Sequence, residues 1–173
     1  ALKIYLEKED LPKSKFYAKQ ALDEIRYMIG QSHLDFSGDF EKLVAETCRT
    51  FEANFGIQTA TYFASKKAAA LSEGAKAHLM RILQEALSNI ARHADASRVE
   101  VRLVDTIGEL RFIISDNGKG FAFEDVEKQN QSDGAKHYGL LNIKKRAELI
   151  GARVDFMTEG GSTIAVTVED SVR

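Results

Sequence analysis

The 173-residue sequence predicts an α+β fold in which helices cover one face of an antiparallel sheet. Two patterns support this prediction. Apolar residues recur at helical spacing through residues 73–93. Apolar and polar residues alternate through 99–103 and 110–114, which a turn at 106–108 joins as a hairpin. Hydrophobic residues make up 44% of the chain and charged residues 29%, so a core can form and disorder throughout the chain is excluded.

Composition excludes several functional classes. The 24 Lys and Arg nearly balance the 26 Asp and Glu, which argues against non-specific nucleic-acid binding. Cys48 is the single cysteine, so an intrachain disulfide and a cysteine-based zinc site are excluded. No apolar run approaches the roughly 20 residues of a membrane helix, and no signal peptide opens the chain. We therefore expect a cytoplasmic chain with no direct contact to nucleic acid or membrane.

The first part of the chain is helical in pattern. Apolar residues at 1–7 and at three- and four-residue spacing through 16–29 predict two short helices joined by a turn that contains the only proline. We expect residues 1–30 to form a partial helical hairpin that pairs with a second copy of itself. The alternative is a hairpin folded onto its own domain. Residues 31–39 are predicted to be a linker.

Residues 40–170 are predicted to form one domain. A helix over 40–55 should end at Gly56, because glycine readily adopts the left-handed conformation after a helix. Residues 57–63 should form a strand, and the polar residues 121–137 are predicted to be a mobile loop. The remaining expected elements are a helix over 139–150 and strands over 154–157 and 162–168.

The predicted helix over 73–93, which Ser72 would cap, carries a row of polar side chains. Glu85, Asn89 and His93 are spaced i, i+4 and i+8, and Arg92 lies near the same side. A carboxylate, an amide oxygen and a cation in one row could hold a hydrated Mg²⁺ against phosphates, because Mg²⁺ keeps most of its waters. The alternative is a solvated helix face.

Glycine-containing segments follow the apolar elements at three places. After the strand at 110–114 come Asp116, Gly118 and Gly120, where backbone could approach a ligand and Asp116 could accept a hydrogen bond from an exocyclic amine; the alternative is an ordinary turn. Gly139 opens a helix whose free N–H groups could bind an anion, although any helix can begin with glycine. In Gly160–Thr163, a hydroxyl could reach the same pocket.

In order and spacing, these segments resemble the ATP-binding domain of the GHKL superfamily, and specifically that of sensor histidine kinases of the nitrate-sensor type. "QEALSNIARHA" resembles the N-box, "DNGKGF" the G1 box, "HYGLLNIKKRAELIGA" the G2 box and "GGSTIAVTV" the final glycine–threonine strand. The resemblance covers residues 40–168 and extends more loosely to "ALDEIRYMI" in the N-terminal hairpin. It implies a Bergerat-type ATP-binding α/β sandwich preceded by part of a dimerisation hairpin.

The resemblance also implies roles for individual residues. Asp116 would accept from the adenine amine, with Gly118 contributing backbone and Thr163 assisting through water. Asn89 would ligate Mg²⁺, and Glu85 would orient a metal-bound water or help polarise the attacking group. Arg92 and His93 would meet the phosphates. The lid hinges and the phosphate-facing backbone would be Gly120, Gly139 and Leu140.

The sequence departs from the family pattern at a few positions. Arg92 stands where lysine is usual, which keeps the charge, while Ala152 replaces a glycine and Ile143 a methionine. Ser162 is interpreted as replacing the glycine before the threonine, where its side chain would crowd the rim of the pocket.

The resemblance implies a sensor kinase that binds ATP and Mg²⁺, phosphorylates a histidine and passes the phosphoryl group to a response regulator with a helix-turn-helix output domain. The family's acceptor histidine lies in a His-Asp/Glu motif, and no histidine here is followed by Asp or Glu. We therefore expect a cytoplasmic fragment of a membrane-anchored sensor that begins after its acceptor. The alternatives are an anti-sigma-factor-type serine kinase and a non-enzymatic dimerisation module.

Overall fold

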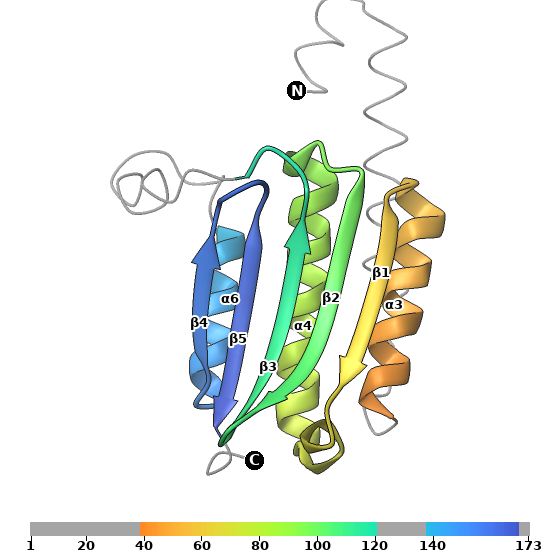
Figure 1. Ribbon diagram of the computed structural model, residues 1–173. Coiled ribbons are helices and arrows are strands. Elements are labelled where there is room, and N and C mark those ends of the chain that lie inside the picture. Colours follow the sequence, from red (N-terminus) through yellow and green to blue (C-terminus); the bar gives the residue numbers. More distant parts are fainter. Residues whose placement is uncertain (1–38, 121–137, 170–173) are drawn as a thin grey trace, which may run out of the picture. The chain divides into compact units, whose positions relative to one another are not determined.

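The computed structural model describes residues 39–120 and 138–169 (Figure 1). The chain divides into two compact units, Ala1–Asp35 and Phe36–Arg173, and the described residues belong to the second. The predicted hairpin, nearly all of the predicted linker and the predicted loop therefore lie outside the described residues. In the part of the chain that the structure describes, no helix is long and apolar enough to cross a membrane.

A five-stranded sheet in the order β1-β2-β3-β5-β4 forms one layer of the domain, and the helices of the described residues lie together on one of its faces (Figure 1). The strands are β1 (Gln58–Ala64), β2 (Arg98–Thr106), β3 (Glu109–Asp116), β4 (Arg153–Met157) and β5 (Thr163–Glu169). The helices are α3 (Phe40–Phe55), α4 (Glu73–Asn89) and α6 (Tyr138–Leu149). The predicted α+β class is confirmed.

The pairing of the sheet differs from the prediction at one edge. The pairs β2–β3, β3–β5 and β4–β5 are antiparallel, as expected, but β1 runs parallel to β2. The connection between β1 and β2 contains α4, which carries the chain back along the sheet. A strand entered after such a return runs in the same direction as the strand before it, so the expectation of a wholly antiparallel sheet was wrong.

The ends of the helices follow the expected capping chemistry. Gly56 has φ 69° and ends α3 in the left-handed conformation. The hydroxyl of Ser72 accepts a hydrogen bond from Ala75 N at 3.2 Å and caps α4. The predicted helix over 73–93 differs in its last turn, because Ile90–Ala94 forms a π-helical turn, after which Asp95 is left-handed with φ 52°.

Alternation along β3 explains where the core ends. Leu110, Phe112 and Ile114 face the helices and are almost fully buried, and the Phe112 ring meets Phe40 of α3 edge to face with ring centroids 5.8 Å apart. The next inward position is Asp116, only 8% exposed. The strand therefore delivers a carboxylate to the edge of an apolar core.

Candidate functional site

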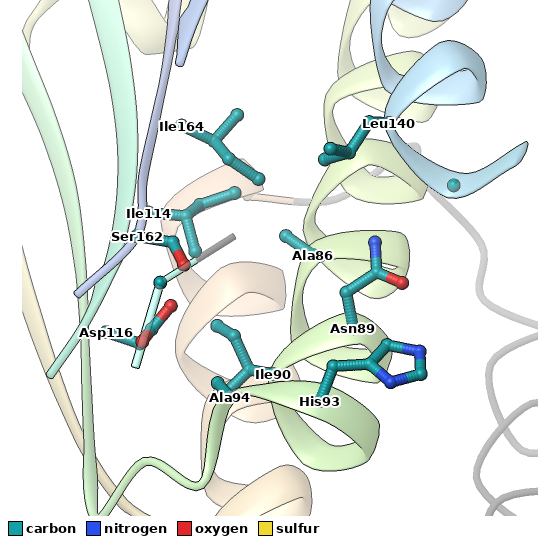
Figure 2. A pocket seen from close by; sticks show the side chains of 12 residues that line it. Ala86, Asn89, Ile90, His93, Ala94, Ile114, Asp116, Leu140, Ser162 and Ile164 are labelled. Carbon is teal, nitrogen blue, oxygen red and sulfur yellow. The ribbon is translucent and has the colours of Figure 1, made fainter. Parts of the chain in front are cut away.

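A cavity of about 290 Å³ opens where α4 and its π-helical turn face β3, the start of β5 and the start of α6 (Figure 2). Apolar side chains form most of its surface. Asp116 and Ser162 contribute polar atoms from the sheet side, while Asn89 and His93 contribute them from the helix side. Its lining comprises Ala86, Asn89, Ile90, His93, Ala94, Ile114, Asp116, Gly120, Gly139, Leu140, Ser162 and Ile164. An apolar slot with polar groups on opposite sides suits a flat aromatic ring that carries a charged group.

Only one of the two carboxylate oxygens of Asp116 accepts a hydrogen bond from the described residues. Its Oδ1 accepts a hydrogen bond from Gly118 N at 2.7 Å, and its own backbone N donates to Ser162 O at 2.9 Å. Among the described residues, Oδ2 accepts no hydrogen bond. Because Asp116 lines the cavity, a ligand bound there can donate a hydrogen bond to this oxygen.

Two glycines allow the backbone around Asp116 to pack closely. A Cβ on Gly118 would overlap the carbonyl of Ala94, so Gly118 lies against the end of the π-helical turn instead of lining the cavity. Gly161 has φ 131°, and a Cβ there would overlap the carbonyl of Asp116. Any larger residue at either position would have to displace the segment that carries the carboxylate.

The predicted metal-binding pair lies beside the start of α6. A Cβ on Gly139 would lie 2.5 Å from Glu85 Oε1 and 2.8 Å from Asn89 Nδ2, so both side chains pack directly against this glycine. Asn89 Nδ2 is buried and makes no hydrogen bond within the described residues. Turning the amide by 180° to present its oxygen would therefore break no hydrogen bond there.

This donor set fits Mg²⁺ better than a metal held by protein alone. The described residues contain no group of three or more His, Cys, Asp or Glu that could hold a metal ion. One carboxylate oxygen and one amide oxygen, from Glu85 and Asn89, match the one or two protein ligands that Mg²⁺ takes when water and phosphate supply the rest.

The structure separates the two predicted cations. His93 lines the cavity, whereas the Arg92 guanidinium turns back along its own helix, donating from Nη2 to Ser88 Oγ at 2.6 Å and from Nε to Ser88 O at 3.3 Å. Arg92 is therefore held outside the lining, and of the two residues only His93 lines the cavity.

The hydroxyl in the cavity belongs to Ser162, not to Thr163. Thr163 pairs with Ser115 and Met157, and strand alternation directs it to the face opposite Ile164, which lines the cavity. Sequence reasoning assigned this role to Thr163 and treated Ser162 as an obstruction. The missed signal was the alternation of Ile164 with its neighbours, because even-numbered positions of this strand face the helices.

The other predicted site residues occupy the expected region. Asn89, His93, Asp116, Gly120, Gly139 and Leu140 all line the cavity, with Glu85 and Gly118 next to it. Sequence reasoning missed the apolar lining, which is Ala86, Ile90, Ala94, Ile114 and Ile164. These side chains read as ordinary core positions, and only the packing of α4 against the sheet leaves a space between them.

Comparison with known proteins places this geometry in a family. Residues 74–171, more than half of the chain, match the family described as "Histidine kinase-, DNA gyrase B-, and HSP90-like ATPase". Sensor histidine kinase LiaS of Bacillus subtilis is 40% identical over 100 residues, which are 58% of this chain and 26% of LiaS. Sensor histidine kinase LnrJ of the same organism is 28% identical over 155 residues, which are 90% of this chain and 36% of LnrJ.

Solved structures agree on the fold. The histidine kinase domain of the Erythrobacter litoralis EL346 blue-light activated histidine kinase superposes with a TM-score of 0.62 at 14% identity, covering 95% of this chain and 86% of that domain. The chain thus spans about a quarter to a third of the length of the two sensor kinases above. The resemblance drawn from the sequence is confirmed: the chain belongs to the family of histidine kinase-, DNA gyrase B- and HSP90-like ATPases.

Proposed function

We propose that this chain is the catalytic region of a two-component sensor histidine kinase, which binds Mg-ATP and donates its γ-phosphoryl group to a histidine. The observation that carries the proposal is the cavity itself, in which Asp116 and the pair Asn89 and His93 stand on opposite sides of an apolar slot. The family match and the sensor kinases among the relatives support it.

Adenine would bind in the apolar part of the slot. The free Oδ2 of Asp116 would accept a hydrogen bond from the exocyclic amine, because that oxygen has no partner among the described residues. Ile114 and Ile164 would contact the ring from the sheet side and Ile90 from the helix side. We assign the assisting hydroxyl to Ser162, which faces the cavity beside Asp116 (Figure 2).

The phosphates would lie along the polar row of α4. The oxygen of Asn89 would reach Mg²⁺ directly, and the carboxylate of Glu85 would hold one of its waters or accept a proton from the attacking histidine ring. His93 and the N–H groups at the start of α6 would face the phosphates. Bound Mg²⁺ supplies charge neutralisation at the phosphate oxygens. The protein supplies mainly positioning, which is what phosphoryl transfer chiefly requires.

We further propose that the acceptor histidine and the partner-binding regions belong to a larger protein. We propose that residues 1–30 pair with a second copy as part of a dimerisation hairpin, with a linker at 31–39 before the domain at 40–170. The histidine phosphorylated by the intact kinase would pass its phosphoryl group to a response regulator with a helix-turn-helix output domain. The whole protein would be a membrane-anchored sensor with this region in the cytoplasm.

A transfer assay tests the kinase assignment. The chain, Mg²⁺ and radiolabelled ATP are mixed with a separate polypeptide that carries an acceptor helix with a His-Asp/Glu motif. Acid-labile label on that polypeptide is expected, and the absence of acid-labile label would contradict the assignment. Acid-labile label on a histidine of this chain would instead contradict the expectation that the acceptor lies outside it. Acid-stable label on serine would instead identify a serine kinase of the anti-sigma-factor type.

A binding titration tests the site. Asp116→Asn places a donor opposite the adenine amine, and an unmatched buried polar pair costs about 1–3 kcal/mol, so ATP affinity should fall roughly ten- to a hundredfold. Asp155→Asn, on the exposed face of β4, is the matched control and should bind like the wild type. Wild-type affinity in Asp116→Asn would remove Asp116 from adenine recognition.

A further inference from the structure

A short turn at residues 117–119, outside the cavity, connects the two walls of the cavity. Asp116 ends β3 on the sheet side, and the π-helical turn Ile90–Ala94 forms part of the helix side. Asn117 follows Asp116, is exposed and does not line the cavity. Its position allows it to bond to the segment that leads from the π-helical turn into β2.

The Asn117 side chain makes a dense set of bonds to that segment. Its Oδ1 accepts hydrogen bonds from Ser97 N at 3.0 Å and from Arg98 N at 2.9 Å. Its Nδ2 donates to Ser97 Oγ at 2.9 Å, and its backbone N donates to Arg98 O at 3.2 Å. One residue therefore ties the end of β3 to the beginning of β2 through both its side chain and its backbone.

Gly118 and Lys119 of the same turn make further contacts with the end of the π-helical turn and with Asp95. Lys119 N donates to Ala94 O at 2.8 Å, and Gly118 packs against the same carbonyl. Lys119 Nζ also pairs with Asp95 at 2.8 Å; this hydrogen bond, and then the lysine charge, lowers the pKa of Asp95. Both of these side chains are largely exposed, at 62% and 82%, so this ion pair contributes little to holding the turn.

The orientation of the Asp116 carboxylate follows from the turn. Gly118 N reaches Asp116 Oδ1 at 2.7 Å only while the turn keeps its present shape. That bond leaves Oδ2 as the oxygen available to the cavity. Because hydrogen bonds weaken steeply when distance or angle departs from the ideal, a small movement of the turn would cost the bond that Oδ2 makes to a ligand.

We infer that Asn117 is a positioning residue that aims Asp116 at the exocyclic amine of the base and so contributes to nucleotide selectivity. This inference rests on the proposed ATP site. It assigns Asn117 no contact with nucleotide: the residue acts through Asp116. Its effect should therefore be confined to nucleotides whose base carries the amine.

The test compares ATP with purine riboside triphosphate, which lacks the amine, in Mg²⁺-containing titrations. Asn117→Ala should lower ATP affinity about three- to tenfold and leave the affinity for the analogue nearly unchanged, so that the preference for ATP shrinks. Asn117→Asp should restore the preference, because a carboxylate oxygen can still accept from Ser97 N and Arg98 N. Lys119→Ala is the control within the same turn and should retain the preference.

Equal losses for both nucleotides in Asn117→Ala would overturn the inference, since a merely destabilised domain would bind both less well. A preference that stays at the wild-type value would also overturn it. Thermal unfolding identifies variants that fold poorly. If Asn117→Ala is one of them, Asn117→Ser, which keeps a short acceptor, carries the same comparison. A wild-type protein that does not prefer ATP would instead count against Asp116 and the proposed site.

Discussion

At the scale of single residues, two neighbouring residues of similar chemistry can lie on opposite faces of the sheet. Ser162 and Thr163 both carry a hydroxyl, yet only Ser162 lies in the cavity, because successive side chains of a strand point to opposite faces. Composition cannot distinguish the two residues. The register of β5 against β3 and β4 does.

Substitution of these two residues should separate their roles. Ser162→Ala removes the hydroxyl next to Asp116 and should weaken ATP binding about three- to tenfold, the cost of one lost hydrogen bond. Thr163→Val keeps the shape of the side chain and should leave affinity unchanged. Calorimetric titration of both variants with ATP measures the two affinities. Weaker ATP binding by Thr163→Val with unchanged binding by Ser162→Ala would instead assign the assisting hydroxyl to Thr163.

Cys48 illustrates what burial does to a reactive group. It lies on the inner face of α3 at 1% exposure, and this burial raises the pKa of its thiol to about 12. Because the thiolate is the nucleophile, Cys48 should resist alkylation by iodoacetamide at neutral pH in the folded protein and react once urea unfolds it. Mass spectrometry measures the label. Rapid labelling without denaturant would show that α3 opens readily.

At the scale of elements, the contact between α4 and α6 determines the geometry of the predicted metal-binding pair. Gly139→Ala would place a methyl group against the ends of Glu85 and Asn89. Flexible side-chain ends can move aside at a small cost in stability, but they then leave the positions needed at the phosphates. We expect Mg²⁺-dependent ATP affinity to fall at least about tenfold, because small misplacements at a reacting centre have large effects.

Gly74→Ala provides the control for this change. Gly74 lies in the first turn of α4, and a Cβ there would meet only Ser72 Oγ at 4.0 Å. This substitution should stabilise the protein by about 0.4–1 kcal/mol and leave ATP binding unchanged. Thermal unfolding and nucleotide titration of both variants provide the comparison. Unchanged binding in Gly139→Ala would show that the α4–α6 contact does not control the site.

Another junction between elements should make stability depend on pH. Asp105 of β2 accepts hydrogen bonds from Ser65 Oγ at 2.6 Å, Lys66 N at 2.8 Å and Lys67 N at 3.2 Å. Burial, the largest influence, raises the pKa of Asp105, but these hydrogen bonds and the Lys67 charge together lower it below its ordinary value of 3.8. The ionised carboxylate is therefore favoured in the folded state.

A group with a lowered folded pKa stabilises the fold above its unfolded pKa and loses that contribution as the pH falls through the folded value. Wild type should therefore exceed Asp105→Asn in free energy of unfolding at neutral pH. The difference should shrink progressively below pH 3.8. Urea unfolding of both proteins across this range measures it. A difference independent of pH would mean that the charge of Asp105 contributes nothing to this junction.

At the scale of the whole molecule, the nucleotide site belongs to the second compact unit. All of its lining residues fall within Phe36–Arg173. A polypeptide of residues 36–173 should therefore fold alone and bind Mg-ATP as tightly as the full chain does. At a hundredfold excess of ATP over its dissociation constant, binding should stabilise both by about 2.7 kcal/mol. Markedly weaker binding by the shorter chain would show that residues 1–35 contribute to the site.

Much of the architecture is determined by local pattern. Helical spacing, strand alternation and capping residues such as Gly56 and Ser72 are short-range properties, and the structure places these elements within a few residues of the prediction. Asp116 could likewise be predicted at the end of a buried strand, because it continues the alternation of Ile114 and Phe112.

Tertiary structure decided what depends on contacts between distant segments. The parallel pairing of β1 with β2 and the entry of Ser162 into the cavity both depend on how elements meet. Residues far apart in the chain line the cavity, and their packing leaves one oxygen of Asp116 without a hydrogen-bond partner among the described residues. Sequence patterns report the surroundings of a residue along its own helix or strand. The cavity is a property of the packing between them.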